Sequence, residues 1–136
     1  MNSIGKKTNK VEDYRTAVKK IHDHGMEVIG EFVFGFDYDT PDIFEKTYEF
    51  IQDIEIDLPA PGILTPYPGT SLFNRLERED RILTKDWSKY SEREVVFKPK
   101  KMTKEQLFNG TEKIKEKIFY LTLEKYKQNR SKFWSK

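Results

Sequence analysis

The sequence has 136 residues, a formal net charge of +2 and no cysteine. Its length suffices for one domain with a hydrophobic core, and the lack of cysteine excludes disulfides, thiolate metal ligands and a cysteine nucleophile within the chain. No run of about 18 apolar residues occurs and residues 1–10 lack the apolar segment of a secretory signal, so a cytoplasmic protein is expected.

Charge is distributed unevenly along the sequence. Residues 98–136 hold 12 Lys and Arg against 4 Glu, a net of +8, whereas residues 1–97 hold 13 against 19, a net of −6. A basic segment can contact phosphates or an acidic partner, but the same pattern is typical of a solvated helix face. Nucleic-acid binding is the less favoured alternative, because no recognised nucleic-acid-binding motif accompanies the charge.

The first predicted elements are a helix over Lys10–His24 and a strand over Met26–Phe36. The apolar stripe of this helix is formed by Tyr14, Val18 and Ile21. Gly25 is expected to end the helix as its C′ residue. The strand is largely apolar on both faces, which is typical of a parallel strand that is covered on both sides.

A second helix and a second strand are predicted next. Thr40 is the expected N-cap and Pro41 the first helical residue, and the helix runs to about Ile54. A loop is expected over Asp57–Pro61. The short strand Gly62–Thr65 follows and ends where prolines, which cannot donate a hydrogen bond to a ladder, enter the sequence.

The rest of the sequence is predicted to be mainly helical. Thr70 or Ser71 caps a helix to about Glu79, residues 81–91 are irregular, and Glu94–Lys98 forms a short strand.

A capping box of Thr103 and Gln106 begins a final helix over Lys104 to about Lys132. The buried seam of that helix is formed by Leu107, Ile114, Ile118 and Leu121.

This element order predicts an α/β fold: a partial (β/α) barrel with two parallel strands and their helices, followed by a helical C-terminal extension. The barrel portion covers residues 1–80. The extension, an irregular segment and then a long helix, covers residues 81–136. Ligands of such sheets bind beyond the carboxyl ends of the strands, so we expect the site in the loops that follow the two strands.

Three acidic residues near the first strand are candidates for chemistry. Asp37 and Asp39 form a D-x-D pair, which either holds a divalent cation, as in many glycosyltransferases, or stabilises the positive end of the next helix. Glu31 is a carboxylate within an apolar strand and is expected to line a polar pocket that contacts substrate or cofactor. No catalytic residue and no metal ligand is predicted, since no nucleophile elbow or ligand cluster is recognised.

Two stretches resemble a known family. V-F-G-F-D-Y-D-T-P-D-I-F-E-K-T-Y-E-F at residues 33–50 is similar to the fifth-strand segment of radical S-adenosylmethionine (SAM) enzymes, and L-T-P-Y-P-G-T-S-L-F at residues 64–73 is similar to their sixth strand and its Pro-Gly-Thr turn. The closer resemblance is to radical SAM proteins with an N-terminal cobalamin-binding domain, in which R-I-L-T-K-D-W-S-K-Y and K-M-T-K-E-Q-L also have counterparts. It covers about Lys6 to Gly110.

This resemblance implies roles for individual residues. The residues assigned to the adenosine part of SAM are Val33, Phe34, Gly35, Asp39, Leu64 and Thr65, the last two largely through backbone groups. Gly35 would permit close approach of the backbone to the cofactor. Glu31 and Tyr67 are assigned to the substrate pocket. The sequence departs from the family at Asp37-Tyr38, where those enzymes have Pro-Gly.

The resemblance also implies the chemistry of a complete enzyme. A [4Fe–4S] cluster would cleave SAM reductively and start radical chemistry such as methyl transfer or cyclisation, with cobalamin in members that bind it. This chain lacks the three cluster cysteines, so it is interpreted as the C-terminal part of such an enzyme, inactive alone and without tight cofactor binding. Its expected partners are the missing N-terminal part and further copies joined through the open barrel edge. The alternatives are a stand-alone non-catalytic binding or regulatory module and, less favoured, a fragment of a D-x-D glycosyltransferase.

Overall fold

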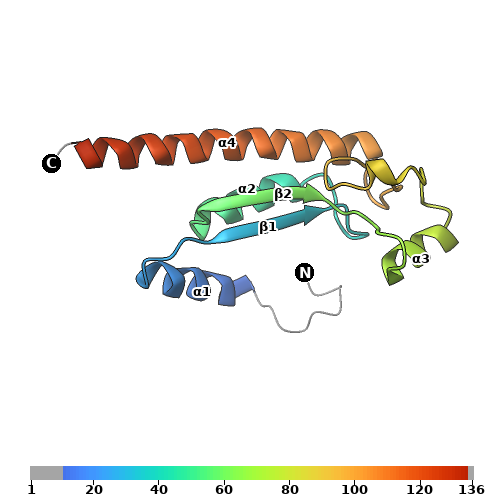
Figure 1. Ribbon diagram of the computed structural model, residues 1–136, viewed down its shortest axis with the longest axis horizontal. Coiled ribbons are helices and arrows are strands. Elements are labelled where there is room, and N and C mark those ends of the chain that lie inside the picture. The colour runs from blue at the N-terminus through green and yellow to red at the C-terminus, as the bar shows by residue number, and fades with distance from the viewer. Residues whose placement is uncertain (1–10, 135–136) are drawn as a thin grey trace.

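The computed structural model describes residues 11–134, and the side chains of residues 13–128. Its elements are, in chain order, α1 (Val11–Asp23), β1 (Ile29–Phe34), α2 (Ile43–Asp53), β2 (Leu58–Ile63), α3 (Ser71–Arg78), a 3₁₀ turn η1 (Trp87–Lys89) and α4 (Lys104–Trp134) (Figure 1). The predicted α/β fold with two parallel strands, their helices and a long C-terminal helix is confirmed.

The two strands form a parallel pair. β1 and β2 lie side by side with Ile29 opposite Leu58 and Phe34 opposite Ile63. The strands that lead into the two family-like stretches are therefore neighbours that run in the same direction, as predicted. Both strands lead toward α3 and the start of α4, so the loops that follow them meet at one end of the molecule (Figure 1).

The predicted bounds of the strands need correction. β1 spans Ile29–Phe34, shorter than predicted, and β2 begins at Leu58, so the loop expected over Asp57–Pro61 is wrong. β2 contains two prolines, Pro59 and Pro61.

The prolines fit because β2 uses alternate residues for its pairing with β1. The amide of Leu58 donates to the carbonyl of Val28, directly before β1, at 3.1 Å, so Pro59 and Pro61 direct their nitrogens to the opposite edge, where the ladder needs no donor. On that opposite edge the amide of Ile63 donates to the carbonyl of Glu92 at 2.8 Å. The outer edge of β2 is thus closed partly by proline and partly by the extension.

Helix α1 ends as predicted. Gly25 has φ +72°, its amide donates to the carbonyl of His22 at 2.9 Å, and the amide of Met26 donates to the carbonyl of Ile21 at 3.2 Å. This pair of bonds is a Schellman motif, which requires a left-handed residue that glycine supplies at least cost.

The predicted start of α2 is two residues too early. The helix begins at Ile43, with Asp42 as its N-cap residue, whereas Pro41 and Asp42 form a turn in which the amide of Ile43 donates to the carbonyl of Thr40 at 2.9 Å. The hydroxyl of Thr40 donates to the carboxylate of Asp42 and so does not cap the helix. Two helix-start signals in succession compete, and the side-chain bond between them decides the boundary.

The capping box of α4 is confirmed. The amide of Thr103 donates to Oε1 of Gln106 at 2.8 Å, and the amide of Gln106 donates to Oγ1 of Thr103 at 3.0 Å. α4 runs along the outside of the molecule and extends past the amino ends of the strands (Figure 1). Neither α4 nor any other helix in the described residues is long and apolar enough to cross a membrane.

The short strand expected over Glu94–Lys98 is wrong. This segment makes an isolated antiparallel bridge, Ile82 with Phe97, which the amide of Leu83 extends by donating to the carbonyl of Val96 at 2.9 Å. The helix cap predicted at Thr70 is correct, because its hydroxyl accepts from the amide of Phe73 at 3.2 Å.

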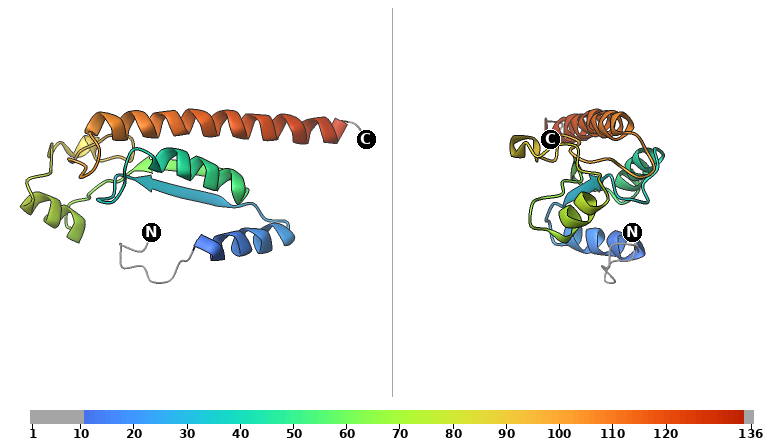
Figure 2. Two further views of the ribbon diagram at one scale, coloured as in Figure 1. Left: turned by 180° about the vertical axis from the view of Figure 1, so that it is seen from behind. Right: turned by 90° about the vertical axis from the view of Figure 1, so that its right-hand side faces the viewer.

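The helices cover one face of the sheet. An end-on view shows α1, α2 and α4 arranged around the strands (Figure 2). The core between them contains Val18, Phe34, Ile51, Ile54, Ile56, Ile63, Leu76, Phe97, Met102, Leu107, Ile114 and Ile118. Residues from both sides of the predicted boundary at position 80 share this core, and the boundary itself stays a prediction.

No helix within residues 11–134 lies over the opposite face of the sheet. Successive residues of a strand point to opposite faces, so β1 buries Phe34, which is 2% exposed, and leaves Val33 40% exposed. We call the uncovered surface the open face; its residues are Ile29, Glu31 and Val33 of β1 with Leu58 and Ala60 of β2.

Candidate functional site

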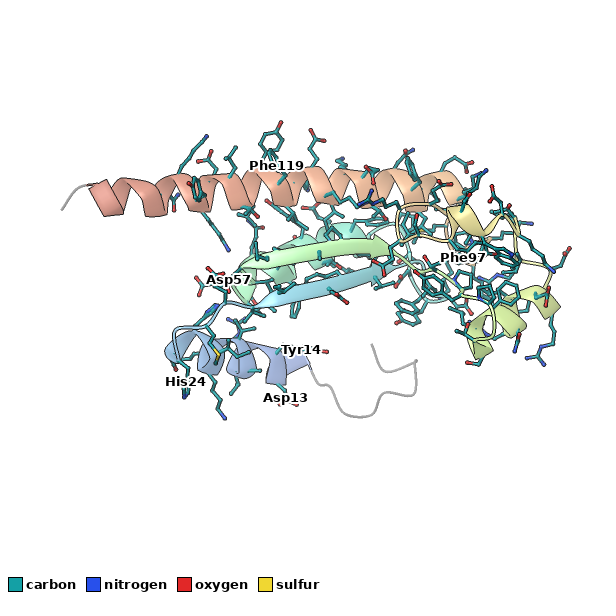
Figure 3. All side chains as sticks on the ribbon, in the orientation of Figure 1. Asp13, Tyr14, His24, Asp57, Phe97 and Phe119 are labelled. Atoms are coloured by element: carbon teal, nitrogen blue, oxygen red, sulfur yellow. The ribbon has the colours of Figure 1, made fainter. Side chains whose placement is uncertain are left out.

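The candidate site lies at the carboxyl ends of β1 and β2. The loop of residues 35–42 follows β1, and the loop of residues 64–70 follows β2. The amide of Leu64 donates to the carbonyl of Phe34 at 2.8 Å and holds the two chain segments together where the strands end. Side chains from α3 and the extension gather at the same end, with Phe97 among them (Figure 3).

Asp39 organises the first loop from within. It is buried, and its Oδ2 accepts hydrogen bonds from the amides of Gly35 at 2.9 Å and Phe36 at 3.0 Å. Burial raises the pKa of Asp39, and the two amide bonds offset that rise only in part. Asp39 therefore fixes the turn directly after β1, and any contact with a cofactor would be additional to that role.

Asp37 joins the first loop to α3 and the extension. Its carboxylate receives Arg75 on one oxygen and Arg81 on the other, the latter at 2.8 Å, and Arg81 also binds Glu79 at 2.7 Å. Burial alone would raise the pKa of Asp37, but the hydrogen bonds from Arg81 and Arg75 outweigh it and hold this pKa below its usual value. Because Arg81 is largely buried and also donates to the carbonyl of Lys98 at 2.8 Å, the network ties three segments together.

The D-x-D interpretation receives no support from this geometry. Asp37 is committed to arginines and Asp39 to backbone amides of its own loop, so the two carboxylates serve different partners. No group of three or more His, Asp or Glu side chains that could hold a metal ion occurs among the described residues. Neither aspartate caps α2, whose N-cap residue is Asp42, and a stabilising effect of their charge on the positive end of the helix stays a prediction.

The β1 residues assigned to the adenosine part of SAM differ in whether their side chains are accessible to a ligand. The side chain of Phe34 is buried against the ring of Phe44, with centroids 4.8 Å apart, and is not available to a ligand. Gly35 has φ +112°, and a Cβ at this position would lie 3.0 Å from both Leu107 and Phe97. This glycine is required by the packing of α4 and the extension, a reason that the sequence did not reveal. Val33 alone of the three presents its side chain on the open face.

The second loop is held by its own backbone. Thr65 is buried, and its hydroxyl donates to the carbonyl of Ile63 at 3.2 Å, while Leu64 is partly buried. The amide of Tyr67 donates to the carbonyl of Thr65 at 3.0 Å, and its carbonyl accepts from the hydroxyl of Thr70 at 2.7 Å. The Tyr67 side chain is exposed, so it can contact a ligand at this end of the sheet.

Glu31 is exposed in the middle of the open face rather than enclosed in a pocket. It lies between Ile29 and Val33 on β1 and opposite Ala60 on β2. No polar pocket surrounds the carboxylate among the described residues, and its contact with substrate or cofactor stays a prediction. A wall of this shape needs something opposite it to become a pocket.

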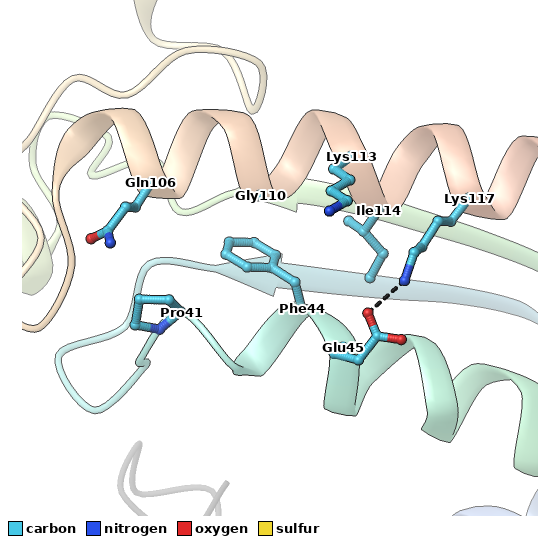
Figure 4. Close-up of a pocket in the computed structure, with 8 residues that line it drawn as sticks. All are labelled: Pro41, Phe44, Glu45, Gln106, Gly110, Lys113, Ile114 and Lys117. Carbon is cyan, nitrogen blue, oxygen red and sulfur yellow. Dashed lines mark hydrogen bonds and ion pairs between the residues drawn. The ribbon is translucent and has the colours of Figure 1, made fainter.

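A pocket within the described residues lies on the other side of the sheet. A cavity of about 250 Å³ opens between the start of α2 and α4; its lining residues are Pro41, Phe44, Glu45, Gln106, Gly110, Lys113, Ile114 and Lys117 (Figure 4). The ion pair of Lys117 with Glu45, at 2.5 Å, lies across it. This cavity is on the helix side of the sheet and is separate from the open face.

Sequence reasoning missed Arg75 and Arg81 as members of the site. Both lie far from Asp37 in sequence, and nothing local marks them. The only available signal was their position after the second strand, in a stretch with an excess of charge.

Comparison with known proteins connects the chain to a group of enzymes, although no protein-family model matches it. It is 35% identical over 119 residues to bacteriochlorophyllide d C-12(1)-methyltransferase of Chlorobaculum tepidum, covering 88% of this chain and 26% of that protein. It is 36% identical over 91 residues to the uncharacterized methyltransferase PH0819 of Pyrococcus horikoshii, covering 67% of this chain and 20% of the relative. It is 30% identical over 104 residues to the anaerobic magnesium-protoporphyrin IX monomethyl ester cyclase of Cereibacter sphaeroides, covering 76% of this chain and 17% of the relative.

The similarity extends over most of this chain but over a minor part of each relative. The chain is thus distantly homologous to one region of radical SAM methyltransferases and cyclases of the cobalamin-binding type, and it spans 17% to 26% of the length of these three relatives. The resemblance inferred from the two loop sequences is confirmed at this level.

Proposed function

We propose that this chain forms one wall of the active-site cavity of a radical SAM methyltransferase or cyclase. The observation that carries the proposal is the asymmetry of the sheet: helices cover one face, whereas the open face is apolar at Ile29, Val33 and Leu58 and is uncovered. In a closed (β/α) barrel one face of every strand meets helices and the other faces the interior. The two strands have this pattern.

The iron–sulfur cluster of such enzymes does not fit this chain. Clusters of this kind are held by cysteine thiolates, and the chain has no cysteine. We therefore derive no step through the cluster and assign its binding to other residues of a complete enzyme. The contribution of this chain is to bind and orient what lies against the open face.

The adenosine part of SAM fits better at the strand ends. Val33 offers an exposed side chain there, and the backbone of Leu64 and Thr65 runs beside it, while Asp39 and Asp37 hold the first loop in shape. Phe34 and Gly35 take part only through the position of their backbone. Glu31 and Tyr67 remain the proposed substrate contacts, because both side chains are exposed.

The substrate class is proposed from the open face and the relatives together. Two relatives are named for bacteriochlorophyllide d and for magnesium-protoporphyrin IX monomethyl ester, both large macrocycles with extended apolar surfaces. An apolar wall with a single carboxylate suits a substrate of that kind, since most of the binding free energy would come from buried apolar area. Methyl transfer or ring closure would then take place on a mainly apolar molecule.

The proposal can be tested on the chain itself by NMR titration with SAM, 5′-deoxyadenosine and methionine. We expect weak binding, with chemical-shift changes confined to residues near Val33, Gly35 and Thr65, produced by SAM and by 5′-deoxyadenosine but not by methionine. Val33→Asp should remove these changes, and Tyr120→Lys on the far side of α4 should leave them intact. Shifts that map to the cavity between α2 and α4, or no shifts at millimolar ligand, would contradict the proposed adenosine edge.

The stand-alone binding module predicts a different affinity. A module that had kept a complete SAM site would bind SAM in the micromolar range, whereas one wall of a larger site should bind far more weakly. Calorimetric titration separates the two, and a micromolar dissociation constant would favour the module.

A further inference from the structure

Helix α4 carries a second, uncovered stripe beside the one that packs on the sheet. Residues along a helix are rotated by about 100° each, which places Phe108, Lys115, Phe119 and Tyr126 in one row. Phe119 is 63% exposed, and Phe108 and Tyr126 are also exposed. Figure 3 places Phe119 midway along the helix. The core-facing residues, such as Leu107 and Ile114, lie on a neighbouring side of the helix. The side-chain partners of this row belong to α4 itself: Lys115 donates to Glu112 at 2.7 Å, and the ring of Phe119 lies 5.7 Å from that of Tyr120.

The spacing in this row is symmetric. Its members are seven, four and seven residues apart, so Phe108 and Tyr126 have the same midpoint, position 117, as Lys115 and Phe119. A row with such symmetry is complementary to itself when two helices run antiparallel about a two-fold axis, because each member then meets its counterpart twice. Phe108 would meet Tyr126 of the second copy, and Lys115 would meet the ring of Phe119 of the second copy.

We propose that two copies of this chain pair through antiparallel α4 helices, centred on position 117. The row supplies two aromatic contacts and two contacts of an ammonium group with a ring, and both kinds are favourable. A pair of opposite charges fits the same register. Glu105 and Lys127 lie on the same flank of the row, and in the pair Glu105 of one copy lies within about 3 Å, along the helix axis, of Lys127 of the other. Both side chains are exposed.

A lipid surface fits this row less well as a binding partner than a second copy of the chain. Glu105, Glu112 and Glu116 lie on one flank of the aromatic side chains, and carboxylates at that position would be repelled by anionic headgroups. In an antiparallel pair the same acids remain at the solvated rim, where Glu116 of the two copies lie within about 3 Å of each other along the axis and offset part of the attraction between Glu105 and Lys127. The contact covers about 18 residues of helix, or roughly 27 Å, which is small for a protein interface, so the dimer should dissociate on dilution.

Sedimentation velocity on the full chain over a wide concentration range tests the pair. We expect reversible dimerisation that Phe119→Lys weakens by at least about tenfold, because a lysine then faces Lys115 of the second copy. Adding Lys115→Glu to that variant should restore pairing, since each copy then presents opposite charges at the two positions. Tyr67→Lys is the control: Tyr67 is also an exposed aromatic, at 47%, but it lies in the loop after β2, outside α4, and should not affect dimerisation.

Engineered cysteines test the direction of the pair in a chain that has none of its own. A mixture of Phe108→Cys and Tyr126→Cys variants should form a mixed disulfide, and neither variant alone should crosslink. A monomer at all concentrations, a dimer that Phe119→Lys leaves unchanged, or crosslinking of Phe108→Cys to itself would each overturn the proposal. A dimer that is lost instead on substitution of Val33 or Leu58 would overturn it too and place the contact on the open face.

Discussion

The two faces of the sheet use the same strands for different purposes. On the covered face, Phe34 and Ile63 are buried under α2 and α4 and hold the fold together. On the open face, Val33 and Leu58 are exposed one residue away along the same strands. The hydrophobic residues of β1 therefore cannot all be treated as core. Their position in the alternation decides whether a side chain contributes to folding or remains available for binding.

The two aspartates of the first loop differ in a related way. Asp39 faces inward and bonds only to its own loop, whereas Asp37 reaches across to α3 and the extension. Asp39 thus stabilises the conformation of its own loop, and Asp37 stabilises the contact of that loop with segments distant in sequence.

The largest expected difference between the two faces is in core truncation. Phe34→Ala removes a buried ring and should lower the free energy of unfolding by about 3 to 5 kcal/mol. Val33→Ala removes exposed atoms and should lower it by less than about 1 kcal/mol. Urea denaturation of both variants checks this pair of values. Similar losses for both would mean that the open face is covered within the folded chain.

A second test concerns the contact between α2 and α4 on the covered face. A Cβ on Gly110 would overlap the ring of Phe44. Gly110→Ala should therefore lower the free energy of unfolding by about 1 to 2 kcal/mol, despite the better helix propensity of alanine.

The matched background is Phe44→Leu, which shortens the opposing side chain. In that background Gly110→Ala should be neutral or stabilising by up to about 1 kcal/mol. An unchanged penalty in the double variant would show that the cost arises within the helix rather than at Phe44.

The two aspartates should give opposite pH dependences. The pKa of Asp37 is lowered by its arginines, so its stabilising contribution is present above the unfolded pKa of about 4 and is lost as pH falls through the folded value. The pKa of Asp39 is raised by burial, so the stability linked to it is full at low pH and is lost as pH rises through the folded value.

Urea denaturation between about pH 3 and pH 7 can measure both effects. The stability deficit of Asp37→Asn, relative to the unsubstituted chain, should shrink as pH is lowered, and that of Asp39→Asn should grow. Parallel pH profiles for the two variants would refute the assignment of different environments.

The smallest expected effect is on the open face itself. Glu31→Thr replaces an exposed side chain with a good strand former and should change the free energy of unfolding by no more than about 0.5 kcal/mol. A loss above 1 kcal/mol would show that the Glu31 carboxylate has a partner within the chain.

Local signals predicted the helix ends and caps well. Gly25, the Thr70 cap and the capping box at Thr103 behave as expected, because each depends on bonds within a few residues. The start of α2 and the extent of β2 were predicted wrongly. At α2 two adjacent start signals competed, and at β2 the direction of the proline nitrogens depends on which edge pairs, which a single strand does not reveal.

The sequence by itself determined the order of the helices, the parallel pair of strands and the end of the sheet at which the two loops lie. It did so because hydrophobic periodicity and turn chemistry act over short distances along the chain. Only the tertiary structure decided that position 35 must lack a side chain because Leu107 and Phe97 pack against it. It also decided that Asp37 binds Arg75 and Arg81 and which face of the sheet stays open. Those outcomes depend on side chains that are distant in sequence and meet only when α4 and the extension pack on the sheet.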